Sequence, residues 1–155
     1  MKVIEGGILA KSRKIAVIQA KFNSLISSTL VQGAVDTLKR HGVAEEDIDL
    51  IKVPGAFEIP LVLMKVAQSG RYDGAVCLGA VIRGETPHFD FVAGENAKGI
   101  QSVMMEFGFP AAYGVITPNN LEQALERAGV KAGNKGSEAA SVLVEMLDLC
   151  EQLKS

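Results

Sequence analysis

Four short apolar runs recur along the chain, each about the length of a β-strand and rich in valine and isoleucine. They cover residues 14–20 (KIAVIQA), 48–54 (IDLIKVP), 74–82 (GAVCLGAVI) and 111–117 (AAYGVIT). The third run shows no alternation of apolar and polar residues, which is typical of a strand covered on both faces. The pattern therefore predicts four strands, of which the third is the most buried.

Patterns of helical period separate these runs. In the first, apolar residues recur every four positions from Ile26 to Leu38, after a predicted cap at Asn23 and before a stop at Gly42. Further helices are predicted over 60–70, from residues 86–87 to near 108, over 121–129 after a start at Asn120, and over 137–153. A glycine-rich segment, 130–136, separates the last two helices.

Strands that alternate with helices predict an α/β fold, because a parallel pair of strands needs a crossover connection and a helix is the usual one. We expect a three-layer α/β/α sandwich around a central, mainly parallel four-stranded sheet, formed by residues 1–155 as one domain. The segment MKVIEG at 1–6 is too short to be stable alone. It is expected to add a short N-terminal strand to the edge of a sheet, this chain's own or a neighbour's.

Charge and composition exclude several classes of protein. With 16 Lys and Arg against 18 Asp and Glu, the chain lacks the basic excess expected of a nucleic-acid-binding protein. No segment approaches the roughly 20 apolar residues needed to span a bilayer, and residues 1–14 lack the apolar core of a signal peptide. We therefore expect a cytoplasmic protein that binds neither nucleic acid nor membranes. Cys77 and Cys150 are predicted to be buried, unreactive thiols rather than disulfide partners or metal ligands.

Candidate binding residues follow the predicted strands, because ligands of open parallel sheets bind beyond the carboxyl ends of the strands. These residues are 22–23, 54–58, 83–88 and 117–118. Gly84 permits close backbone approach, and the amides from Glu85 onward adjoin a helix amino end, where phosphate can bind. The helix dipole there favours a neutral His88 imidazole, which can accept a proton and return it. The alternative is that His88 is a surface residue in an ordinary strand-to-helix connection.

Other candidates also have two interpretations. Phe22 can stack on a planar ring or pack in the core, and Glu58 can bind a polyol or an amine or stabilise a helix amino end. Arg127, Lys135 and Glu138 flank the glycine-rich segment, where they can form a phosphate site or interact with helix dipoles. No GxGxxG fingerprint, P-loop or metal-ligand spacing occurs. Residue patterns alone therefore indicate an α/β domain that binds a phosphorylated ligand.

Five motifs in fixed order carry a more specific signal. They are KFN (21–23), VPGAFEIP (53–60), GAVIRGETPHFDFV (79–92), YGVIT (113–117) and LEQALERAGVKAGNKGSEAA (121–140). With them the sequence resembles the lumazine synthase family, which catalyses the penultimate step of riboflavin biosynthesis, over nearly the whole chain. The resemblance implies a flavodoxin-like fold. It also implies condensation of 5-amino-6-ribitylaminouracil with 3,4-dihydroxy-2-butanone 4-phosphate to 6,7-dimethyl-8-ribityllumazine, without a metal or redox cofactor.

The resemblance further implies a role for each candidate residue. His88 would be the catalytic general acid and base, and Phe22 would stack on the pyrimidine. Ala56 and Glu58 would bind the ribityl chain, with Phe57 beside them, and Val81 and Ile82 would surround the heterocycle. The amides of Glu85 and Thr86 would bind the phosphate together with Arg127. The remaining substrate-binding positions would be Tyr113, Lys135 and Glu138. Two of these positions depart from the family, in which residue 85 is small and residue 113 is usually phenylalanine. An acidic Glu85 is expected to repel phosphate unless it turns to solvent, and the Tyr113 hydroxyl needs a partner if it is buried.

The resemblance also implies self-assembly of the chain. Family members form pentamers. Those that close into shells of sixty subunits have a short connection between the last two helices, whereas several that stop at pentamers have extra residues there. Here the connection AGVKAGNKGSE is short, so we expect pentamers within a 60-subunit shell that could enclose riboflavin synthase as a partner. The alternative function is that of a non-catalytic flavin or lumazine carrier, or of a shell protein, on the same fold.

Overall fold

A four-stranded parallel sheet forms the middle layer of the computed structural model, which describes residues 1–84, 88–129 and 133–154. Its strands are β1 (Ile15–Ala20), β2 (Ile48–Val53), β3 (Gly74–Ala80) and β4 (Ala111–Ile116). They lie in the order β2-β1-β3-β4, and every neighbouring pair is parallel. The four predicted strands are confirmed, with bounds within two residues of the expected ones.

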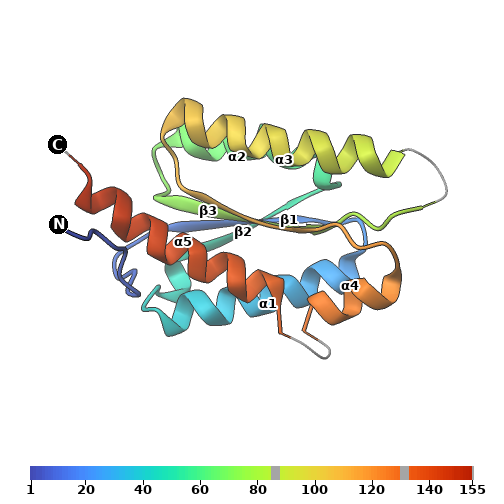
Figure 1. Cartoon of the computed structure of the whole chain (residues 1–155), viewed down its shortest axis with the longest axis horizontal. Coiled ribbons are helices and arrows are strands. Elements are labelled where there is room, and N and C mark those ends of the chain that lie inside the picture. Colours follow the sequence, from blue (N-terminus) through green and yellow to red (C-terminus); the bar gives the residue numbers. More distant parts are fainter. Residues whose placement is uncertain (85–87, 130–132, 155) are drawn as a thin grey trace.

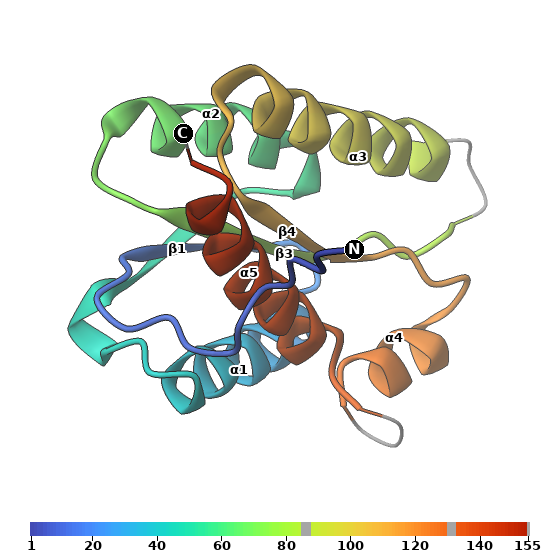
Figure 2. The same ribbon diagram turned by 60° about the vertical axis from the view of Figure 1, so that its left-hand side comes forward.

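Helices cover both faces of the sheet. One face carries α1 (Ser24–Arg40), α4 (Leu121–Arg127) and α5 (Lys135–Gln152), and the other carries α2 (Ile59–Ser69) and α3 (His88–Phe107) (Figures 1 and 2). Short turns η1 (Glu45–Asp47) and η2 (Ala56–Glu58) precede and follow β2. The predicted three-layer, flavodoxin-like sandwich is thus confirmed. Across the described residues, no helix combines the length and the apolar character needed to cross a membrane.

The two inner strands, β1 and β3, are buried along their whole length. Cys77 lies in β3 and is fully buried, and this burial raises the pKa of its thiol to about 12, so that it is inert as predicted. The same prediction is wrong for Cys150, which is exposed. The last turn of α5, which carries this residue, extends beyond the ends of the strands and has no sheet beneath it (Figure 1).

The helix ends confirm one predicted cap and overturn another. Asn120 caps α4, accepting a hydrogen bond from the Gln123 amide at 2.9 Å. Asn23 does not cap α1, because its backbone is left-handed (φ 59°) and its side chain donates instead to the carbonyl of Ala80 at 3.1 Å. The last helix begins two residues earlier than predicted, since Asn134 accepts hydrogen bonds from the amides of Gly136 and Ser137.

The first residues of the chain form no strand in its own sheet, so that part of the prediction is wrong, whereas pairing with a neighbour's sheet stays a prediction. The segment is held against α5 instead. Gly7 donates its amide hydrogen to Asp148 at 2.7 Å, which lowers the pKa of that carboxyl group. Gln152, in the last turn of α5, donates to the carbonyl of Glu5 at 2.8 Å. The two ends of the chain are therefore joined to each other.

A tight contact of α5 with the backbone of α1 generates a first prediction. A Cβ atom added at Gly136 would collide with the carbonyl oxygen of Leu30, which is backbone and cannot move aside easily. Gly136→Ala is therefore expected to lower the free energy of unfolding by about 1–3 kcal/mol, as overpacking does. Urea denaturation at fixed protein concentration measures this change.

Gly94→Ala is the matched control, because Gly94 also lies within a helix but has no neighbouring atom within 4 Å of an added Cβ. The better helix propensity of alanine predicts an unchanged or higher stability there, by up to about 1 kcal/mol. Equal effects of the two substitutions would contradict the close contact between α1 and α5.

Candidate active site

The carboxyl edge of the sheet gives the candidate site a rigid base. Backbone hydrogen bonds continue the parallel pairing beyond the strands, from Phe22 N to Pro54 O (3.1 Å), from Val81 N to Ile116 O (2.9 Å) and from Arg83 N to Pro118 O (3.0 Å). The Asn23 amide adds a cross-link to the end of β3. The residues that follow the four strands are therefore held at one edge, as the topology predicts.

A first cavity of about 600 Å³ opens at this edge, on the face that carries α2 and α3. It is lined by Phe22, Asn23, Gly55, Ala56, Phe57, Glu58, Ala80, Val81, Ile82, His88, Phe91 and Val92. Seven of the thirteen candidate residues lie here together: Phe22, Ala56, Phe57, Glu58, Val81, Ile82 and His88. They come from the ends of three strands and from the start of α3.

Aromatic rings and few polar groups define the chemistry of the first cavity. Phe22, Phe57 and Phe91 are 73%, 59% and 68% exposed, and such a group of apolar rings around a cavity suits a planar ligand. A Cβ atom at Gly55 would lie 3.1 Å from the Phe22 ring and 3.3 Å from the Glu58 carboxylate. The Phe22 ring and the Glu58 carboxylate therefore both lie beside Gly55. A ligand bound there can stack on the ring and donate a hydrogen bond to the carboxylate.

The start of α3, which carries His88, is held by Arg83. The Arg83 guanidinium lies 3.7 Å from the Asp90 carboxylate and 4.5 Å from the centre of the Phe89 ring. It also donates to the side-chain oxygen of Asn119 at 3.1 Å. Arg83 thus connects the first turn of α3 to the segment between β4 and α4, a role that the sequence motif alone did not indicate.

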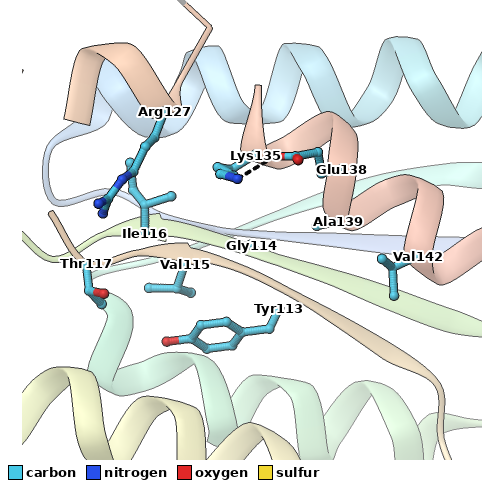
Figure 3. Close-up of a pocket in the computed structure, with 10 residues that line it drawn as sticks. All are labelled: Tyr113, Gly114, Val115, Ile116, Thr117, Arg127, Lys135, Glu138, Ala139 and Val142. Atoms are coloured by element: carbon cyan, nitrogen blue, oxygen red, sulfur yellow. Dashed lines mark ion pairs between the residues drawn. The ribbon is translucent and has the colours of Figure 1, made fainter. Parts of the chain in front are cut away.

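A second cavity of about 630 Å³ lies at the outer edge of β4 (Figure 3). Its lining comprises Tyr113, Gly114, Val115, Ile116, Thr117, Arg127, Lys135, Glu138, Ala139 and Val142, four of which were candidates. The Lys135 ammonium pairs with the Glu138 carboxylate at 3.0 Å. Arg127 and Lys135 together outweigh this one carboxylate, so the cavity favours an anion.

Comparison with known proteins shows the family of the chain. The sequence model of the 6,7-dimethyl-8-ribityllumazine synthase family matches residues 12–151. The chain belongs to this lumazine synthase family. A protein from Helicobacter pylori strain J99 that is named 6,7-dimethyl-8-ribityllumazine synthase is 54% identical over 155 residues, which cover 99% of each chain.

The candidate site residues of this lumazine synthase family member line two cavities that have no residue in common. His88 belongs to the first cavity and Arg127 to the second, so the structure does not bring these two residues into one cavity of a single chain. Glu85 and Thr86, the predicted phosphate-binding amides, lie outside the described residues. The proposed repulsion between Glu85 and phosphate accordingly stays a prediction.

Tyr113, the other departure from the lumazine synthase pattern, lies half-exposed on β4 beside Cys77 of β3. Burial raises the pKa of its phenol, and the neighbouring Cys77 thiol adds to the shift. The phenol therefore stays protonated at neutral pH and can donate a hydrogen bond. In Figure 3 its ring lies on the opposite side of β4 from Arg127 and Lys135, so the second cavity wraps around a strand edge.

The structure also adds lining residues that were not among the sequence candidates, including Phe91 and Val92 in the first cavity and Val142 in the second. Phe91 follows His88 by three positions, which places both on one side of a helix. Helical spacing could therefore have found Phe91. The position of Val142 in the second cavity depends on how α5 packs against β4, and no local sequence pattern predicts that packing.

Proposed function

We propose that the chain condenses 5-amino-6-ribitylaminouracil with 3,4-dihydroxy-2-butanone 4-phosphate to give 6,7-dimethyl-8-ribityllumazine, phosphate and water, in riboflavin biosynthesis. The observation that carries this proposal is the aromatic first cavity with Glu58 and His88, in a chain that matches the lumazine synthase family over residues 12–151. A cytoplasmic location and riboflavin synthase as a partner stay predictions.

Proton transfer is the main chemical task in this reaction. The uracil amine attacks the ketone, the carbonyl oxygen leaves as water, phosphate is eliminated and the ring closes with loss of a second water. Each step moves a proton, and His88 at the edge of the first cavity is the proposed general acid and base, a role typically worth about 10²–10⁴-fold in rate. Phe22 would stack on the pyrimidine while Glu58 accepts hydrogen bonds from ribityl hydroxyl groups.

The phosphate would bind to Arg127 together with the amides of Glu85 and Thr86, with Lys135 beside Arg127 in the second cavity. Because Arg127 and His88 line different cavities of one chain, this requires a second subunit. We propose that the first cavity of one subunit faces the second cavity of its neighbour in a closed ring of five. A head-to-tail contact of this kind repeats identically in a cyclic assembly. Two observations support it: β4 lies at the edge of the sheet, and the Phe57 and Phe91 rings are exposed in the single chain, where a neighbour could cover them.

A non-catalytic flavin or lumazine carrier is the alternative, and neither the family match nor the relative favours it. A turnover assay with both substrates separates the two functions. An enzyme forms the lumazine product, whereas a carrier binds added product and forms none.

The first test of the site concerns His88. His88→Ala is expected to lower kcat by one to three orders of magnitude and to leave product binding nearly unchanged, because water replaces an acid and base only in part. The control is His41→Ala, since the ring of His41 contacts the carbonyl of Ile8 at 2.6 Å and lines neither cavity. Parental turnover in His88→Ala would remove this residue from the mechanism.

Mixed assemblies test whether two subunits share a site. His88→Ala and Arg127→Ala would damage opposite sides of one interface, so random mixing of the two chains leaves about a quarter of the interfaces intact on both sides. Co-expressed chains are therefore expected to show activity well above that of either variant alone. If mixed rings form without any gain, the two residues act from the same subunit and the shared site is wrong.

The size of the assembly is a separate prediction. Only residues 128–134 separate α4 from α5, and in the family a short connection accompanies closure into a shell. We expect sedimentation velocity and electron microscopy at neutral pH to show a 60-subunit shell built of pentamers. Free pentamers as the sole species would contradict this expectation.

A further inference from the structure

Asn96 is a fully buried amide in the middle of α3, with 0% of its surface exposed. It shares its face of the helix with the apolar Phe89, Ile100 and Val103. Its side-chain oxygen is the one buried side-chain polar atom in 1–84, 88–129 and 133–154 that has no hydrogen-bond partner.

The amide nitrogen of Asn96 has a partner that matters for the first cavity. It donates to the backbone carbonyl of Ala56 at 2.6 Å, and since a carbonyl can only accept, the nitrogen rather than the oxygen must face it. The same carbonyl accepts the Ile59 amide hydrogen that closes η2. This turn places Phe57 and Glu58 in the lining of the cavity.

The hydrogen bond therefore joins two walls of one cavity. One wall is η2, and the other is the first turns of α3, which contribute His88, Phe91 and Val92. One turn beyond Asn96, Gly99 packs so closely on the ring of Pro60 that an added Cβ would lie 2.7 Å from its Cγ. This apolar contact sets the distance between α3 and α2, but it is not directional. The hydrogen bond from Asn96 is directional, so it also fixes the position of η2 along the axis of α3.

We propose that Asn96 is a positioning residue, which holds η2 in register with α3 through the Ala56 carbonyl and thereby sets the spacing between Glu58 and His88. The substrate affected is the one that carries the polyol chain, because Glu58 is the polyol-binding group of the proposed function on which this inference rests. The unpartnered oxygen is consistent with such a role. An apolar side chain of the same size would fill the site without burying an unsatisfied carbonyl, so packing alone does not favour asparagine.

Asn96→Leu tests the proposal, since leucine keeps the size and removes both the donor and the unpartnered oxygen. The urea midpoint of unfolding is expected to be equal to that of the parent or higher. The KM for 5-amino-6-ribitylaminouracil and the Kd of the lumazine product are expected to rise about five- to tenfold, the scale of one hydrogen bond. The KM for the butanone phosphate should stay within about twofold, because the cations proposed to bind it lie in the other cavity.

Val103→Ala is the matched control, because Val103 is buried on the same face of α3 but lines neither cavity. It is expected to lower the urea midpoint and to keep both KM values, which separates a general loss of stability from a loss of positioning. Asn96→Ala serves as a second variant that fits the site even if leucine does not, and it is expected to show the same selective rise in KM.

The outcomes separate this inference from the proposed function. No turnover by the parent chain would overturn the function itself. Turnover by the parent with unchanged KM and product Kd in both Asn96 variants would overturn only the positioning role. A parallel rise of both KM values together with a lower urea midpoint would also overturn it, because the effect would then follow stability rather than the polyol end of the site.

Discussion

The burial of β1 and β3 on both faces is the constraint on which the rest of the structure depends. Because no polar side chain other than Gln19 interrupts these two strands, they are stable only between two layers of helices. Helices on both faces require crossovers, and crossovers place all carboxyl ends at one edge. The edge that carries Phe22, Glu58 and His88 is thus a consequence of how the core is built.

The same constraint explains which parts of the fold could be predicted. Strand and helix positions follow from apolar periodicity, so the four strands and the layer order agree with the sequence. Local signals failed where tertiary contacts decide the outcome. The side chain of Asn23 donates to a carbonyl at the end of β3 instead of capping its own helix. Cys150 is exposed because the last turn of α5 extends beyond the sheet.

Prediction of the site divides in the same way. The seven candidates of the first cavity lie directly after strands or at the start of a helix, where topology alone brings them together. Asn96 and Arg83 act through residues distant in sequence, Ala56 and Asn119, and no spacing pattern reports such pairs. The separation of Arg127 from His88 depends on β4 being an edge strand, which required the strand order.

The hydrogen bond between Gln152 and Glu5 has a consequence for the connectivity of the chain. Because the first and last segments of the chain lie side by side, they can be joined, and the chain can be opened at another place without a change in the packing. The exposed turn η1 lies on the connection that enters β2, away from both cavities. In a circular permutant opened there, a short linker would join the old termini. The strands would keep their positions in the sheet, and both cavities would keep the same walls.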